Sequence, residues 1–195
     1  MKLDWTLLEG PDLRLDPVTE AHREGLRAAC DADPATWEQF YPYPMHGPYF
    51  DGTWTRMMGD LAAGRTLPCA VVTGGEVVGL TCYITPDPAN RSVEVGGTYY
   101  RPDARGGRVN PAAKRLMLGH AFDSGAMRVQ FKVDAINARS RAAVSKLGAV
   151  QEGILRQDRV TWTGRVRDTV FFSILADEWP AVRERLDGRL ARATA

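Results

Sequence analysis

Short stretches of alternating hydrophobic and polar residues in the first half of the chain predict strands, with helices between some of them. Leu13–Leu15 is the first expected strand, and Thr19 can cap a helix that runs through Ala28. Residues 33–50 combine four prolines with many aromatic residues, which predicts a long aromatic loop with no more than one helical turn. A second helix is expected over Gly52–Ala63, ending at the following glycine.

The middle of the chain predicts a meander of antiparallel strands. Two strand-like stretches, Leu67–Thr73 and Glu76–Thr85, flank the pair Gly74-Gly75, which is typical of a two-residue hairpin turn. A third strand is expected over Ser92–Tyr100. It contains Gly96-Gly97, and paired glycines inside a strand indicate either a bulge or a close approach of another group to the backbone.

The second half of the chain alternates between strand and helix patterns. Asn110 and Pro111 suit the N-cap and the first position of a helix, and Gly148 suits the end of another. The whole pattern predicts one compact α+β domain over residues 1–195. Its later elements are expected to be a helix to Phe122, a strand over Arg128–Asp134, a helix over Ala138–Leu147, a hairpin of Gly153–Thr163 and Val166–Leu175, and a last helix capped by Asp177.

Composition narrows the class of protein. A chain of 195 residues with 44% hydrophobic and 25% charged residues is typical of one globular domain. No apolar run approaches the roughly 18 residues of a membrane-spanning helix, and residues 1–10 contain no apolar stretch typical of a signal peptide. The three cysteines lie far apart, and the three histidines form no HExxH motif. We therefore expect a cytoplasmic protein without a membrane partner, a disulfide framework or a metal.

The charge of the chain is divided unevenly between its halves. Residues 1–100 hold 7 basic and 14 acidic residues, whereas residues 101–195 hold 18 and 10. The basic half indicates an anionic partner and the acidic half fits a cationic amine, although charges scattered over a solvated surface are the alternative. Binding of nucleic acid or the ribosome through the basic half is a third hypothesis, but no basic motif with interleaved aromatic residues supports it.

The segment from Arg101 to Pro111 is the strongest candidate for chemistry. A strand ends, a basic loop with Gly106 and Gly107 follows, and a helix begins, which together form an anion site suited to phosphate or pyrophosphate. The chain has neither GxxxxGK nor GxGxxG, so two common nucleotide motifs are excluded. A well-capped helix with a solvated basic rim is the alternative. The basic residues of the segment and of the helix that follows are Arg101, Arg105, Arg108, Lys114 and Arg115.

A second candidate follows the next strand. Asn137 stands at the strand end, and Ser140 lies in the first turn of the following helix, which ends before Gly148. The amide of Asn137 could hydrogen-bond a ligand, or the segment could be an ordinary helix start. Cys82, on a strand among apolar neighbours, is expected to be a small buried residue and not a nucleophile.

Together the two segments resemble the GCN5-related N-acetyltransferase (GNAT) superfamily, which uses acetyl-coenzyme A (acetyl-CoA). Within it the chain is similar to the ribosomal-protein N-terminal acetyltransferase (RimJ/RimL-like) type over about residues 10–180. Arg108 stands where the family has Gly, Asn110 where it has Gly or Ala, and Val144 where many relatives have a catalytic Tyr. The aromatic residue that ends the family's second motif is Ala149 here. The resemblance implies a mixed, mostly antiparallel sheet of about seven strands flanked by helices, with one splayed parallel pair, Ser92–Tyr100 and Arg128–Asp134.

The resemblance also implies site residues. Acetyl-CoA is the expected co-substrate, attacked directly by an acceptor amine. Glu94 is the candidate base, with an exposed strand residue as the alternative, and Ser140 is the candidate proton donor to the thiolate, with a helix-turn hydrogen bond as the alternative. Lys132, Asp134, Arg156 and Asp168 are expected to be structural. The residues expected to bind the co-substrate are Tyr99, Tyr100, Arg105, Gly106, Gly107, Arg108, Val109, Asn110, Lys114 and Asn137.

The acceptor is expected to bind at the aromatic segment from Trp37 to Phe50 together with the Arg156–Arg167 hairpin. The candidate binding residues of the aromatic segment are Trp37, Phe40, Tyr41 and Tyr43. A lid on the core or a dimer contact is the alternative role of this segment. The acceptor is either a protein N-terminus, a ribosomal one among them, or a small amine, and a homodimer fits the family. The competing function is that of an acyl-CoA-binding protein of the same fold with weak or different acyl transfer, for example of succinyl groups.

Overall fold

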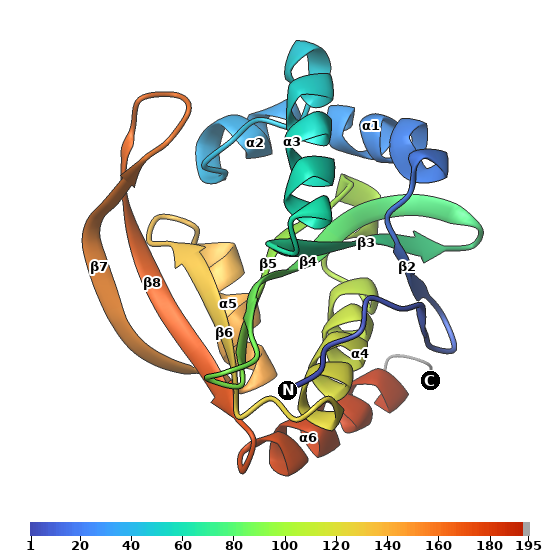
Figure 1. Ribbon diagram of the computed structural model, residues 1–195, viewed down its shortest axis with the longest axis vertical. Coiled ribbons are helices and arrows are strands. Elements are labelled where there is room, and N and C mark those ends of the chain that lie inside the picture. The colour runs from blue at the N-terminus through green and yellow to red at the C-terminus, as the bar shows by residue number, and fades with distance from the viewer. Residues whose placement is uncertain (193–195) are drawn as a thin grey trace.

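The computed structural model describes residues 1–192 and consists of one mixed eight-stranded sheet with helices on both faces (Figure 1). The strand order is β1-β2-β3-β4-β5-β6-β8-β7. Every neighbouring pair is antiparallel except β5 and β6, which are parallel. The strands are β1 (Leu8–Glu9), β2 (Arg14–Pro17), β3 (Thr66–Thr73), β4 (Glu76–Asp87), β5 (Ser92–Tyr100), β6 (Arg128–Asp134), β7 (Val150–Val160) and β8 (Val166–Leu175).

Six α-helices among the described residues cover this sheet. They are α1 (Arg23–Asp31), α2 (Pro34–Phe40), α3 (Phe50–Ala62), α4 (Val109–Asp123), α5 (Ala138–Leu147) and α6 (Trp179–Arg192). The first three lie together at one side of the sheet, whereas α4, α5 and α6 lie at the other (Figure 1). The sheet therefore has a buried core on each face.

The two cores are built from alternate residues of the central strands. Tyr83 of β4 packs with Met117 of α4 in one core, whereas Leu80 of β4 and Tyr99 of β5 pack with Trp37 of α2 in the other. Alternation along a strand sends successive side chains to opposite faces, so β4 and β5 contribute to both cores. Any cavity between these central strands is consequently enclosed by protein on both faces.

The sequence predicted many element boundaries correctly. β6, α5 and β8 have the predicted limits, and Gly148 ends α5 with a φ of 101°. Gly74 and Gly75 turn the β3–β4 hairpin with positive φ angles of 58° and 83°. The expected fold class is confirmed, with the two-residue β1 as an additional strand beyond the seven expected.

Several predicted elements are wrong. Strand β7 is Val150–Val160 and not Gly153–Thr163, and α6 begins at Trp179, so Asp177 is not its N-cap. Residues 34–40 form the helix α2, because Pro34 occupies its first turn, where no N–H is needed, and Asp33 accepts from Thr36 N at 3.3 Å. The prolines therefore bound this helix and do not break it. Asn110 is not an N-cap, since α4 begins at Val109 after Arg108, and the side chain of Asn110 accepts a hydrogen bond from Tyr100 Oη at 3.3 Å.

Candidate active site

The parallel strands β5 and β6 separate soon after they begin. They pair only from Ser92 to Glu94 and from Arg128 to Gln130. Beyond this point β5 continues beside β4 and β6 continues beside β8, so the sheet opens between them. A cavity of about 860 Å³ occupies the opening and reaches from α3 on one face to α5 and α6 on the other.

A bulge in β5 shapes the wall of this cavity. The register of β4 against β5 shifts between Leu80 and Cys82, opposite the glycine pair. Gly97 has a φ of 58°, and a Cβ there would lie 3.4 Å from both Cys82 Sγ and Tyr43 Oη. The predicted bulge is therefore present, and it needs glycine because side chains rarely adopt this backbone conformation.

The glycine loop before α4 lines one end of the cavity. A Cβ at Gly106 or Gly107 would meet no atom within 4 Å, so the backbone there is open to a ligand. Gly106 has a φ of 79°, which bends the loop towards the start of α4. Exposed backbone next to a helix N-terminus is a suitable anion site, as the sequence predicted for this loop.

The two arginines of the loop are placed differently. Arg105 lines the cavity, donates to Tyr100 O at 2.7 Å and pairs with Asp33 Oδ2 at 2.5 Å, so it ties the loop to the start of α2. Arg108 bonds the carboxylate of Asp12 and Leu190 O, and it lies outside the cavity lining, as does Val109. These contacts anchor the Arg108 side chain to the scaffold, away from the cavity.

Three further cations line the α4–α5–α6 side of the cavity, and the sequence analysis did not identify them. Arg139 and Lys146 lie on α5, and Arg189 lies on α6. Arg139 and Lys146 are seven residues apart in one helix and therefore share a face, which is a pattern that the sequence does contain. Arg189 is brought to the site only by the packing of α6 against α4 and α5.

Lys114 is a buried residue of the cavity wall, whereas the sequence placed it on a basic rim. Its side chain is 4% exposed and donates to Thr81 Oγ1 at 2.9 Å and to Thr98 Oγ1 at 2.7 Å. Burial lowers the pKa of Lys114 to about 7. The amine therefore connects α4 to β4 and β5 beside the bulge.

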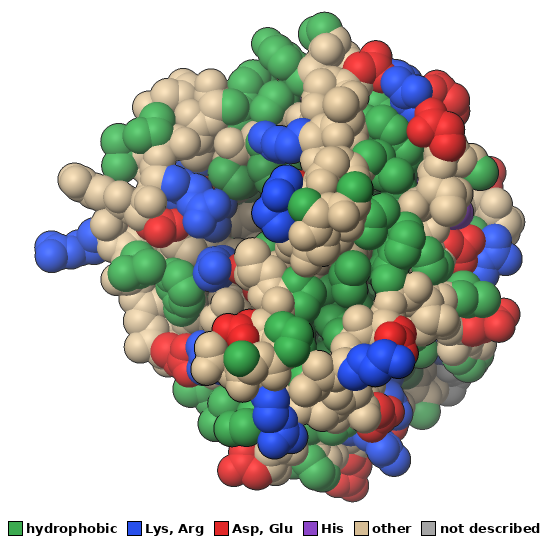
Figure 2. Space-filling view, viewed as in Figure 1, with side chains coloured by type: hydrophobic (Ala, Val, Ile, Leu, Met, Phe, Trp, Pro, Cys, Tyr) green, Lys and Arg blue, Asp and Glu red, His purple; other side chains and the backbone are tan. Residues whose placement is uncertain are grey.

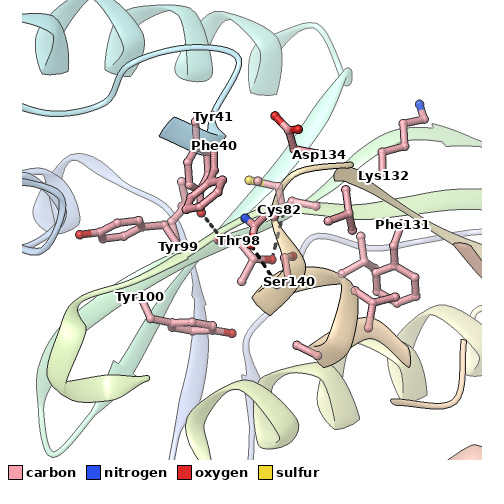
Figure 3. Close-up of a pocket in the computed structure, with 18 of the residues that line it drawn as sticks. Phe40, Tyr41, Cys82, Thr98, Tyr99, Tyr100, Phe131, Lys132, Asp134 and Ser140 are labelled. Atoms are coloured by element: carbon pink, nitrogen blue, oxygen red, sulfur yellow. Dashed lines mark hydrogen bonds between the residues drawn. The ribbon is translucent and has the colours of Figure 1, made fainter. Parts of the chain in front are cut away.

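Glu94 and Lys132 form an ion pair in the opening between β5 and β6. Glu94 is 7% exposed, and its carboxylate lies 2.8 Å from Lys132 Nζ. Both residues line the cavity. Lys132 thus contacts the candidate base directly, and β6 presents Lys132 and Asp134 on the same side (Figure 3).

The start of α5 faces the cavity with Asn137, Ser140 and Val144. Asn137 Oδ1 accepts from Ser140 N at 3.0 Å and so caps the helix, which leaves the amide nitrogen of its side chain for other contacts. The capped first turn fixes where Ser140 enters the cavity. Val144, which the resemblance places at the position of a tyrosine, is 8% exposed and has no proton to donate.

The aromatic segment forms a wall on the α2 and α3 side. Phe40, Tyr41 and Tyr43 line the cavity, and Tyr41 Oη donates to the backbone oxygen of Thr98 on β5 (Figure 3). Trp37 is fully buried and stacks on Tyr99 with ring centroids 4.6 Å apart, so it supports the wall from behind. Of the four residues predicted to bind the acceptor, Phe40, Tyr41 and Tyr43 therefore line the cavity, whereas Trp37 does not.

The other predicted residues are also located. Tyr99 and Tyr100 line the cavity, and their hydroxyls donate to Ala29 O and Asn110 Oδ1. Cys82 is 6% exposed, and burial raises the pKa of its thiol, which confirms a buried residue. Asp168 accepts from Gln157 N at 2.7 Å, and the Asp134 carboxylate pairs with Arg165 Nη2 at 2.5 Å.

Within residues 1–192, no helix has the length and apolar character needed to cross a membrane. The same residues contain no group of three or more His, Cys, Asp or Glu side chains arranged to hold a metal ion.

Comparisons with known proteins agree with this geometry. The family model of the acetyltransferase (GNAT) domain matches residues 12–150. Among solved structures, a protein from T. thermophilus that is assigned as an acetyltransferase is 35% identical, with a TM-score of 0.86 over 97% of this chain and 100% of that chain. A GCN5-related N-acetyltransferase from Brucella melitensis is 28% identical, with a TM-score of 0.86 over 96% of this chain and 86% of that one.

RimJ of Mycobacterium smegmatis, solved in complex with CoA-disulfide, is 25% identical with a TM-score of 0.78 over 91% of this chain and 90% of that chain. A comparison with curated proteins found no match. The splayed parallel pair, the glycine loop and the family match lead to one assignment. The chain belongs to the GCN5-related N-acetyltransferase family of acyl-CoA-dependent transferases.

Proposed function

We propose that this protein is an N-acetyltransferase that transfers an acetyl group from acetyl-CoA to an amine, either a protein N-terminus or a small amine. The observation that carries the proposal is the opening between β5 and β6, which leads from an open glycine loop to an ion-paired carboxylate. The family supplies acyl-CoA chemistry, and the RimJ relative was solved with a CoA derivative.

The phosphates of the co-substrate would bind at Gly106, Gly107 and the start of α4. The backbone there is open, and Arg139, Lys146 and Arg189 surround that end of the cavity with positive charge. The pantetheine arm would follow β5 beyond Glu94, where the strand has no partner on its β6 side. The thioester would then lie between the glycine bulge and the start of α5.

The reaction forms a C–N bond and breaks a C–S bond. The lone pair of the neutral amine attacks the thioester carbon, and the tetrahedral intermediate expels the CoA thiolate. Glu94 accepts the proton that the amine nitrogen loses, directly or through a water, while Lys132 holds the carboxylate in place. Ser140 gives a proton to the thiolate and recovers one from water, since Val144 cannot donate.

A protein N-terminus suits this site because an α-amine has a pKa near 8. About a tenth of the α-amine is therefore neutral, and able to attack, at pH 7. A lysine side chain, with a pKa near 10.4, would need far more help from a base. A fold relative, RimL, is described as a ribosomal L7/L12 α-N-protein acetyltransferase. At 16% identity this likeness extends to the fold alone, so the acceptor has to be measured.

The experiment is an acceptor screen with acetyl-CoA and detection of the released thiol. The panel contains N-terminal peptides, polyamines, free amino acids and aminoglycosides, with succinyl-CoA tested in parallel. Thiol release that depends on an amine supports the proposal. Tight CoA binding without thiol release from any amine would instead favour the acyl-CoA-binding function.

A further inference from the structure

The acceptor side of the cavity is rich in arginine, although the first half of the sequence is acidic. The cations that line this side come from three separate regions, with Arg56 on α3, Lys132 on β6, and Arg159 and Arg167 on the β7–β8 hairpin. Several Lys and Arg side chains gather between the positions of α3 and this hairpin (Figure 2). Folding therefore collects positive charge that is widely separated along the sequence.

The acids on this side are already engaged. Glu94 pairs with Lys132 at 2.8 Å, and Asp60 pairs with Arg65 at 2.6 Å. Arg159 pairs with its neighbour Asp158 at 2.9 Å. Each of these carboxylates therefore already has a basic partner.

Asp134 is shared between two guanidinium groups. Arg165 contacts its carboxylate at 2.5 Å, whereas Arg167 approaches only to 3.8 Å. Two positive charges thus face one negative charge at the junction of β6 and β8. Arg165 and Arg167 together with Asp134 therefore carry a net positive charge beside the cavity.

Arg167 is the buried member of this pair. It is 5% exposed, donates to Thr169 Oγ1 at 3.1 Å, and lines the cavity. Burial lowers the pKa of its guanidinium, which means that the protein environment compensates its charge incompletely. An anion entering from the cavity would supply the missing charge, and a guanidinium can bind carboxylate or phosphate through two hydrogen bonds.

Arg56 lines the same cavity from α3. Its guanidinium lies over the ring of Tyr43, 4.7 Å from the centroid, and it makes no ion pair or hydrogen bond with any described residue. The hydroxyl of Tyr43 would lie 3.4 Å from a Cβ at Gly97, so the ring under Arg56 lies beside the glycine bulge and the expected thioester. The aromatic contact orients this cation without neutralising it.

We propose that the acceptor amine also carries an anionic group, a carboxylate or a phosphate, which binds between Arg56 and the arginines of the β7–β8 hairpin while the amine lies at Glu94. This inference rests on the proposed acetyltransferase function and names the class of acceptor. An anionic acceptor replaces the cationic amine that the acidic N-terminal half suggested. The charge count of residues 1–100 does not take into account which side chains reach the cavity.

The test uses matched acceptors and thiol-release kinetics. Amidated tetrapeptides Ser-Xaa-Ala-Ala with Xaa as Glu, phosphoserine, Gln or Lys vary the charge near the amine, and Glu and Gln are also matched in shape. Serine is compared with serinamide. We expect kcat/KM to be about tenfold or more higher for the anionic member of each pair, with the lowest value for the Lys peptide. The Glu and phosphoserine peptides distinguish carboxylate from phosphate.

Variants connect the preference to the arginines. Arg56→Gln should reduce the Glu-to-Gln selectivity ratio towards one, and Arg56→Glu should favour the Lys peptide. Arg159→Gln should lower the ratio in the same direction without removing the buried Arg167. Arg183→Gln, an exposed arginine on α6, is the matched control and should leave the ratio unchanged.

The outcomes separate this inference from the proposed function. Acetyl transfer with equal rates for the Glu, Gln and Lys peptides, or with a preference for Lys, overturns the anionic acceptor and leaves the enzyme an N-acetyltransferase. A selectivity ratio that Arg56→Gln and Arg159→Gln leave intact overturns the assigned binding place. Absence of transfer to every amine overturns the proposed function and this inference with it.

Discussion

Lys114 shows how one buried side chain joins three elements around the cavity. Its amine contacts Thr81 on β4 and Thr98 on β5 from α4, and no carboxylate of a described residue lies among its hydrogen-bond partners. Burying a cation without an anion costs free energy, and the amine responds by releasing its proton more easily. Lys114 is therefore the residue of this wall whose charge depends most on pH near neutrality.

This property predicts a pH-dependent stability. The unfolded chain keeps Lys114 protonated up to a pKa of about 10.4, whereas the folded chain releases the proton at about 7. Between these values the unfolded state binds more protons, so folding becomes more favourable as pH rises. We expect the free energy of unfolding of the wild type, relative to Lys114→Met, to rise by up to about 1.4 kcal/mol per pH unit between pH 7 and 10. Denaturant titrations at several pH values check this, and a constant difference would contradict it.

The proposed role of Glu94 as the base predicts that the effect of its loss on kcat/KM depends on pH. Glu94→Gln removes the proposed base but keeps the shape of the side chain beside Lys132. For an α-amine acceptor, we expect a large loss of kcat/KM at pH 7 and a small one at pH 9, because more amine is neutral without help at the higher pH. For a polyamine or lysine-type acceptor the loss should persist at both pH values. Glu184→Gln on α6 is the control, and identical profiles for wild type and Glu94→Gln would remove Glu94 from the mechanism.

At the scale of elements, the basic residues of the segment from Arg108 to α6 fall into two groups: some face the cavity, and one holds helices together. Arg139, Lys146 and Arg189 face the cavity, whereas Arg108 holds the start of α4 to Asp12 and to the end of α6. The same type of side chain thus lines the cavity in one place and anchors the helices in another. The difference depends on which partners the packing of the helices provides.

This division predicts opposite effects of two similar changes. Arg189→Gln should weaken CoA binding several-fold in calorimetry, and the loss should shrink at high salt, because the charge contact with phosphate is screened. Arg108→Gln should lower the melting temperature and largely preserve CoA affinity. If Arg108→Gln alone weakened CoA binding, Arg108 would instead be assigned to the phosphate site.

At the scale of the whole molecule, few strand-to-strand hydrogen bonds join the two halves of the sheet on either side of the opening. β5 and β6 share three paired positions, and beyond them the two halves of the sheet are joined through helices and side chains. The tip of the hairpin adds one such contact, since Trp162 Nε1 donates to Trp37 O at 3.4 Å. A ligand in the opening would therefore contact both halves at once.

Binding of CoA should consequently stabilise the entire fold. A ligand that binds only the folded state adds about 2.7 kcal/mol at a concentration of about 100 times its Kd. We expect a rise in melting temperature that grows with CoA concentration, together with slower hydrogen exchange in both β5 and β6. Protection limited to the glycine loop would show that CoA does not bridge the opening.

Local chemistry determined much of this fold from the sequence alone. The turn at Gly74 and Gly75, the end of α5 at Gly148 and the limits of β6 depend on residues within a few positions of one another. The bulge at Gly97 and the open loop at Gly106 follow from the same conformational freedom of glycine. Helix α2 was missed because proline disrupts a helix interior but suits its first turn, and position within the helix decided which effect applied.

Only the tertiary structure decided which charges act together. The Arg105 side chain pairs with Asp33, 72 residues away, and the Arg108 side chain pairs with Asp12, 96 residues away. Lys114 is buried although its sequence neighbourhood is basic, and Arg56 reaches the same cavity as Arg167 from a distant helix. The energy of a charged side chain depends on its burial and on partners that are remote in sequence, and neither is encoded in a local pattern of residues.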